Sequence, residues 1–151
     1  MEPANARTDA RTKTIQATTA QVFAAIRDPL RVARWWGPEG FCSTIHHFDF
    51  RPGGKWYLTL HGPDGKDYPN EYRLLRAEPD HLVEIEHPSD DHYFILRIEL
   101  RQQGDATLVV WQQTFDTVEH YRPLASFLAE ANEQVLARLS AEVHRALSAA
   151  S

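Results

Sequence analysis

Cysteine is almost missing from the 151 residues, and the single one, Cys42, cannot form a disulfide within the chain. This scarcity fits a reducing compartment, so we expect a cytoplasmic protein. Long apolar runs are missing too, which excludes a membrane-spanning helix, because such a helix needs about 20 consecutive apolar residues. Residues 1–10 have no apolar stretch behind their charges, and they therefore do not resemble a secretory signal.

A surplus of positive charge is also absent. The chain carries 16 Lys and Arg against 21 Asp and Glu, which gives a formal net charge of −5. Proteins that bind nucleic acids need a basic face to neutralise phosphates, so we expect no nucleic-acid partner. The contents of 42% hydrophobic and 25% charged residues are instead typical of a folded globular domain.

Motifs for metals and cofactors are lacking as well. The sequence contains no HExxH, CxxC, P-loop, nucleophile-elbow or dinucleotide-binding glycine pattern, so it predicts no cofactor and no metal. Of the eight histidines, His87 and His92 flank a turn and can approach each other, with His46 as a third candidate ligand. No carboxylate at ligand spacing accompanies them, and ordinary strand-end histidines are the simpler interpretation.

Residues 116–151 carry the strongest pattern in the chain and predict one long amphipathic helix. From Pro123 to Leu147 this helix would be roughly 37 Å long at ~1.5 Å per residue. A single apolar stripe of that length is not stable alone in water, so it needs a broad partner surface. The apolar residues that recur at spacings of three and four are Leu124, Phe127, Leu128, Ala131, Val135, Leu139, Val143 and Leu147.

The N-terminal part is expected to contain a frayed tail over residues 1–10, a polar strand over residues 11–17 and two short helices. Thr18-Thr19-Ala20-Gln21 matches a capping box at the start of the first helix. Asp28-Pro29 matches an N-cap followed by proline at the first position of the second helix. Gly37-Pro38 then ends that helix.

Alternating patterns between short turns predict six consecutive strands in the middle of the chain. Pro52-Gly53-Gly54 and Gly62-Pro63-Asp64-Gly65 are typical turn sequences, and connections this short favour antiparallel neighbours. We expect strands near residues 42–50, 54–61, 67–76, 81–87, 92–102 and 106–115. The predicted fold class is therefore α+β, a single domain over residues 11–151 in which a curved antiparallel sheet wraps around the C-terminal helix.

Such a sheet contacts the helix along only part of its concave face, so we expect a ligand cavity between them. Strand alternation and the helix stripe direct seven apolar or aromatic residues toward it: Phe48, Trp56, Leu58, Tyr72, Phe94, Trp111 and Phe127. Trp36, which stands just before Gly37-Pro38, is expected at the rim of the cavity or as a lid. The same alternation directs five polar residues inward: His46, Asn70, His87, Gln113 and Asn132. A buried polar group without a partner costs about 1–3 kcal/mol. These five either pair with one another, the backbone or water, or converge on the polar end of a ligand.

Several motifs are shared with a known family. They are Ala33-Arg34-Trp35-Trp36-Gly37-Pro38, the run Phe48–Trp56, His61-Gly62-Pro63-Asp64-Gly65, Tyr68-Pro69-Asn70-Glu71 and Glu130-Ala131-Asn132-Glu133-Gln134. The chain resembles the bacterial family named after a homologous activator of the heat-shock-protein-90 ATPase, in the START-like, polyketide-cyclase-like (SRPBCC) superfamily. The resemblance implies a helix-grip fold like that of the birch-pollen allergen, with a cavity. Superfamily members bind lipids, sterols, hormones and polyketides, and some catalyse cyclisation or hydrolysis.

Three functions fit these patterns, and we favour the first, which is not enzymatic. It is the binding of a small hydrophobic or amphipathic molecule, with polar inward side chains orienting its head group. The second is a cyclase or hydrolase, with His87 or His46 as general base and Asn70 or Asn132 polarising a carbonyl. The third is a protein-interaction or co-chaperone-like module, of which a homodimer is one form.

Overall fold

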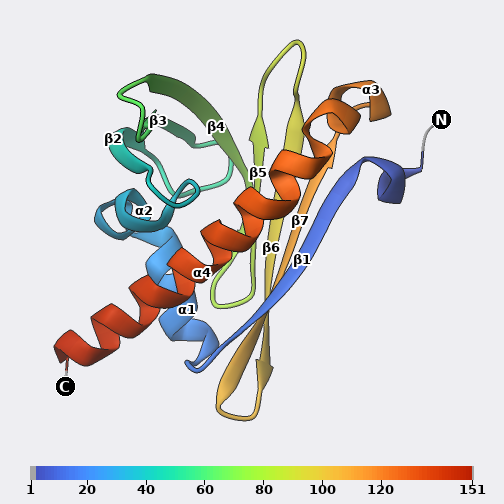
Figure 1. The fold of residues 1–151 in the computed structure, drawn as a ribbon. Coiled ribbons are helices and arrows are strands. Elements are labelled where there is room, and N and C mark those ends of the chain that lie inside the picture. The colour runs from blue at the N-terminus through green and yellow to red at the C-terminus, as the bar shows by residue number, and fades with distance from the viewer. Residues whose placement is uncertain (1–2, 151) are drawn as a thin grey trace.

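Helix α4 (Ala125–Ala150) lies across a curved sheet of seven antiparallel strands (Figure 1). The computed structural model describes residues 3–150. The strands are β1 (Thr8–Ile15), β2 (Cys42–Phe48), β3 (Lys55–His61), β4 (Asp67–Glu78), β5 (Leu82–His87), β6 (Phe94–Gln103) and β7 (Ala106–Phe115). Their order across the sheet is β1-β7-β6-β5-β4-β3-β2. The predicted meander of six strands is confirmed, and so is the helix-grip fold class.

Two short helices, α1 (Thr19–Arg27) and α2 (Pro29–Trp35), follow β1 as expected. Thr18 caps α1 through the predicted capping box, because its hydroxyl accepts from the Gln21 N–H at 3.1 Å and the Gln21 side chain accepts from the Thr18 N–H at 2.8 Å. Asp28 caps α2 by accepting from the backbone N–H of Leu30 at 3.0 Å. These local hydrogen bonds explain why the sequence alone predicts both helix starts.

The expected single C-terminal helix is broken near its start. Helix α3 (Val118–Tyr121) is followed by the 3-10 turn η2 (Arg122–Leu124), and α4 begins only at Ala125. Pro123 lies in the 3-10 turn. Because proline has no N–H and its ring clashes with the preceding turn, an α-helix does not continue regularly through it. No helix within residues 3–150 combines the length and apolar character needed to cross a membrane.

The expectation of a frayed tail is wrong for residues 4–10, and residues 1–2 lie outside the described part. Residues Ala4–Arg7 form the 3-10 helix η1, and β1 begins at Thr8 rather than at residue 11. Strand β1 pairs with β7 from Thr8↔Thr114 to Ile15↔Thr107. The additional residues at its start, Thr8–Ala10, contain no large apolar side chain, so the sequence predicted only the later part of this strand.

The packed core fills the space between the sheet and the C-terminal half of α4. Helices α1 and α2 contact that half of α4, and Trp35 of α2 is fully buried, with its indole N–H donating to the Ala25 carbonyl at 2.9 Å. Leu136, Leu139 and Val143 of α4 are buried in the same core. The two short helices occupy this half, and the space between the sheet and the N-terminal half of α4 is left partly open.

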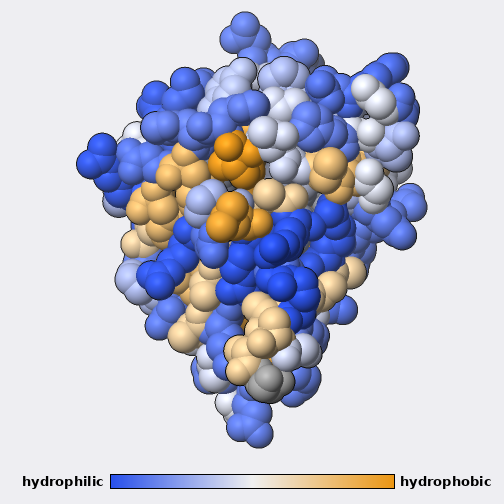
Figure 2. Space-filling view, turned by 90° about the vertical axis from the view of Figure 1, so that its left-hand side faces the viewer, coloured by the Kyte–Doolittle hydropathy of each residue, from blue (hydrophilic) through white to orange (hydrophobic). Residues whose placement is uncertain are grey.

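Charged residues gather on the side of the molecule where α2 meets the C-terminal half of α4 (Figure 2). Glu142 is only 4% exposed. It accepts from Arg31 Nε at 2.8 Å and from Arg145 Nε at 2.8 Å, and Arg34 Nη1 lies 3.7 Å from it. This buried carboxylate therefore fixes α2 to the C-terminal half of α4.

Candidate functional site

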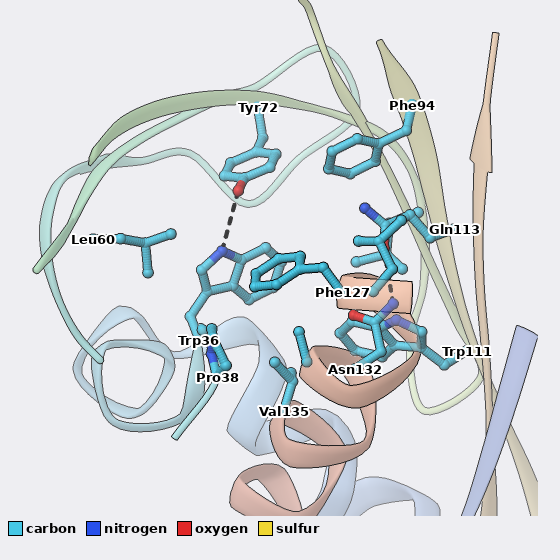
Figure 3. Close-up of a pocket in the computed structure, with 14 residues that line it drawn as sticks. Trp36, Pro38, Leu60, Tyr72, Phe94, Trp111, Gln113, Phe127, Asn132 and Val135 are labelled. Carbon is cyan, nitrogen blue, oxygen red and sulfur yellow. Dashed lines mark hydrogen bonds between the residues drawn. The ribbon is translucent and has the colours of Figure 1, made fainter. Parts of the chain in front are cut away.

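A cavity of about 210 Å³ lies between the sheet and the N-terminal half of α4 (Figure 3). Its lining comes from the end of α2, strands β3, β4, β6 and β7, and α4. None of the described lining residues carries a formal charge. They are Trp36, Gly37, Pro38, Leu60, Tyr72, Phe94, Leu96, Trp111, Gln113, Phe127, Leu128, Ala131, Asn132 and Val135.

Aromatic side chains form one wall of this cavity. The ring of Trp36 packs edge-on against Trp56 at 5.7 Å and against Tyr72 at 5.4 Å between centroids. The Trp36 indole N–H donates to the Tyr72 hydroxyl at 3.3 Å, as Figure 3 shows. Burial raises the pKa of Tyr72 to about 12. The Tyr72 side chain is therefore a neutral phenol at physiological pH, and its own O–H remains available as a donor.

The mouth of the cavity is apolar. Phe127 of α4 lines it and is 61% exposed. The opposite rim is the Gly37-Pro38 turn, where Gly37 has φ +104° and an added Cβ would lie 2.9 Å from the Leu60 side chain. Arg138 of α4 holds this turn, because its guanidinium donates to the carbonyl oxygens of Gly37 at 2.7 Å and Pro38 at 2.9 Å.

The polar end of the cavity is a chain of hydrogen bonds that begins at a buried carboxylate. Asp9 of β1 is 4% exposed and accepts from Arg11 Nε and Nη2, both at 3.0 Å. Asn132 Nδ2 donates to Asp9 Oδ2 at 2.8 Å and to Gln113 Oε1 at 2.9 Å. The order Arg11–Asp9–Asn132–Gln113 thus runs from the outer side of the protein into the cavity.

The charge on Asp9 sets the orientation of both amides in this chain. An ionised carboxylate can only accept hydrogen bonds, so the Asn132 NH₂ group must face Asp9. Gln113 must then present its oxygen to the same NH₂ group, which turns its own nitrogen away. In Figure 3 that nitrogen points away from Asn132 and toward Phe94. The arrangement can bind a hydrogen-bond acceptor in otherwise apolar surroundings.

The cavity brings together seven of the thirteen residues predicted for the site: Trp36, Tyr72, Phe94, Trp111, Gln113, Phe127 and Asn132. The inward direction of strand and helix residues had indicated six of them, and Trp36 had been expected at the rim. Of the five polar residues expected inside, only Gln113 and Asn132 line the cavity. Their side chains are also hydrogen-bonded to each other.

Two of the polar residues expected inside lie outside the cavity, each for a different reason. His46 is exposed, and its Nε2 lies 2.8 Å from Thr59 Oγ1. A β-bulge between Ile45 and His47 inserts one residue and reverses the inward direction along β2. Asn70 is half-buried near the start of β4, beyond the cavity, and donates to the Tyr68 carbonyl at 3.0 Å.

Three apolar residues expected at the cavity belong to the packed core beside it. Trp56 and Leu58 are fully buried, and Phe48 stacks on Trp56 with ring centroids 4.3 Å apart. They do not line the open space, because the ring of Trp36 covers Trp56. These residues face inward as expected, but they do not line the cavity.

His87 is buried one layer behind the cavity wall. Its ring stacks on Phe94 at 5.0 Å, and its Nδ1 donates to the Glu71 carbonyl at 3.0 Å. Burial lowers the pKa of His87. His92 Nε2 lies 3.1 Å from His87 Nε2, as the flanking turn suggested. The described residues contain no group of three or more side chains suited to a metal ion.

Asp9 is the site residue that the sequence did not reveal. It lies in a polar segment without periodicity, and nothing local distinguishes it from an exposed aspartate. The Gly37-Pro38 rim was recognised only as a helix end. The aliphatic lining residues Leu60, Leu96, Leu128, Ala131 and Val135 follow the expected inward pattern.

The sheet, the long helix and the apolar cavity between them define a START-like helix-grip protein. The family model described as Activator of Hsp90 ATPase homolog 1-like protein matches residues 16–144, and the chain belongs to that family. No curated protein matches the chain.

Solved structures agree with this fold. The solution structure of a protein from Arthrobacter aurescens has a TM-score of 0.87 and 21% identity, covering 96% of this chain and 90% of that chain. A Nitrosomonas europaea protein has a TM-score of 0.85 and 14% identity over 96% of this chain and 99% of its own. The AHSA1 protein from Silicibacter pomeroyi has a TM-score of 0.74 and 18% identity over 91% and 97%. At these identities the likeness concerns the fold.

Proposed function

We propose that this protein binds a small hydrophobic or amphipathic molecule in the cavity beside α4. The observation that carries the proposal is an uncharged, largely apolar cavity of about 210 Å³ that has the amide side chains of Gln113 and Asn132 at one end. Ligand sites in proteins are typically of this kind, with apolar walls and a few placed polar groups.

The size of the cavity indicates the size of the ligand. An engineered apolar cavity of about 150 Å³ binds benzene, whereas drug-sized ligands occupy about 300–1,000 Å³. A cavity of about 210 Å³ therefore suits a substituted single ring or a short branched chain. The exposed ring of Phe127 at the mouth offers such a molecule an apolar contact as it enters.

The enzymatic alternative depended on a histidine base, and the two candidates lie outside the cavity. His46 is exposed on β2, and His87 lies behind Phe94 with its Nδ1 bound to backbone. The one titratable side chain among the described lining residues is Tyr72. Its high pKa, about 12, suits a hydrogen-bond donor better than a base at neutral pH.

Binding of toluene and acetophenone, followed by ligand-observed NMR and by tryptophan fluorescence, tests the proposal. The variant Ala131→Phe places a ring in the cavity and should abolish binding of both probes, since Ala131 is a buried lining residue. Ala141→Phe is the matched control, because it makes the same change at an exposed position of the same helix and should leave binding intact. Failure of both probes to bind the wild type, or equal binding by Ala131→Phe, would contradict the proposal.

A further inference from the structure

We infer that the cavity selects neutral carbonyl compounds, such as ketones, esters or amides, over hydrocarbons and carboxylates of the same shape. The inference rests on the proposed function and adds the chemical class of the ligand. It depends on three properties of the polar end of the cavity: unused donors, fixed donor orientation and absence of a compensating cation.

Unused hydrogen-bond donors outnumber unused acceptors among the polar groups of the cavity lining. The Gln113 nitrogen has no acceptor among the described residues, although Gln113 is only 7% exposed. The Tyr72 hydroxyl accepts from Trp36 but has no acceptor for its own proton within residues 3–150. The buried Trp111 indole N–H also lacks a partner in that range. A buried donor left unpaired costs about 1–3 kcal/mol, so a ligand that brings an acceptor gains more than a hydrocarbon does.

The main donor is held in place before any ligand arrives. Rotating the Gln113 amide would set its NH₂ group against the Asn132 NH₂ group, and Asn132 is fixed by Asp9 at 2.8 Å. A donor that is already oriented loses little conformational entropy on binding. A carbonyl oxygen suits such a place because it has two lone pairs and no proton of its own to accommodate. The Asn132 carbonyl oxygen, which accepts no hydrogen bond from the described residues, leaves room for the additional N–H of an amide.

Charge excludes the carboxylate analogue. The described lining contains no Lys, Arg or His, so no cation compensates for the desolvation of an anion. The nearest formal charge in the hydrogen-bond chain is the Asp9 carboxylate, which lies behind Asn132 and repels a second anion. Arg11 lies beyond Asp9 and is already paired with Asp9 and Glu133. The site therefore combines donors with a slightly negative background, which favours a neutral acceptor.

Three probes of nearly equal shape test this inference: acetophenone, α-methylstyrene and benzoate. Water solvates the ketone better than the hydrocarbon, and this difference alone changes their affinities. The test therefore compares the ratio of the ketone affinity to the hydrocarbon affinity between each variant and the wild type, because the hydration of the two probes is the same in every measurement. Gln113→Leu should lower this ratio about tenfold, the loss of roughly one hydrogen bond. Gln112→Leu, one residue earlier on the same strand and outside the cavity lining, should leave it unchanged.

The outcomes separate the inference from the proposed function. The inference is wrong, and the proposed function stands, if both neutral probes bind but their affinity ratio is the same in the wild type, Gln113→Leu and Gln112→Leu. The same conclusion holds if benzoate binds the wild type as tightly as acetophenone at pH 8. If neither neutral probe binds the wild type, the proposed function itself is wrong. Should Gln113→Leu fail to fold, the side-chain amide resonances of Gln113 decide. These resonances should shift downfield when acetophenone is added to the wild type and not when α-methylstyrene is added. A downfield shift with α-methylstyrene but not with acetophenone would overturn the inference.

Discussion

Replacing Asp9 with alanine should destabilise the protein far more than its place near the start of the chain suggests. The change removes the acceptor shared by Arg11 and Asn132, three hydrogen bonds of 2.8–3.0 Å around a carboxylate that is 4% exposed. Removing one partner of a buried ion pair costs about 3–5 kcal/mol. Arg11 is 23% exposed and keeps its second partner, Glu133, so we expect the lower end, about 3 kcal/mol.

Urea denaturation followed by tryptophan fluorescence measures this loss. In a domain of about 150 residues, 1 kcal/mol corresponds to roughly 2–4 °C in Tm, so Asp9→Ala should lower Tm by about 6–12 °C. Glu133→Ala is the matched control, because it removes the other partner of the same arginine at a side chain that is 58% exposed. Exposed pairs contribute about 0–1 kcal/mol. If Asp9→Ala costs no more than Glu133→Ala, the account of the buried chain is refuted.

Three further changes test other parts of the structure. Glu142→Gln removes the buried charge between α2 and α4 and should cost about 2–4 kcal/mol in urea denaturation; a loss below about 1 kcal/mol would contradict the assigned ion pairs. Arg138→Met removes the hydrogen bonds to three carbonyl oxygens at the end of α2 and should lower the free energy of unfolding by about 2 kcal/mol. The backbone amide NMR signals around Gly37 and Pro38 should shift, and an unchanged spectrum there would count against the role of Arg138. Burial lowers the pKa of His87, so the unfolded chain takes up its proton more readily, and the free energy of unfolding should be constant above about pH 7 and fall below about pH 6.5. His87→Gln should flatten that fall in a series of Tm measurements from pH 5 to 8, and an identical slope in the variant would show that another group is responsible.

The features that the sequence predicted are those with a local chemical cause. The capping box at Thr18 and the Asp28-Pro29 start depend on neighbouring residues alone. Likewise, the inward direction of Tyr72 and Gln113 follows from regular alternation along β4 and β7. Such causes act within a few residues and can be recognised without coordinates.

The features that escaped prediction have distant or irregular causes. The bulge beside His46 adds one residue to β2 without a distinctive sequence. The importance of Asp9 depends on Asn132, which lies far along the chain. The division between core and cavity also depends on packing, because Trp36 covers Trp56 and leaves Tyr72 at the open space. No pattern within one strand contains that information.

The pairing of β1 with β7 has a consequence for the order in which the protein is made. Strand β1 leaves the ribosome about a hundred residues before β7, the strand with which it pairs. At about 5–20 residues per second this is a delay of roughly 5–20 s. During that time a nascent chain already carries Asp9, while Gln113 and then Asn132 have yet to be added. The polar end of the cavity, formed by Gln113 and Asn132, is therefore among the last parts to assemble, and a chain arrested before α4 lacks the helix that forms one side of the cavity.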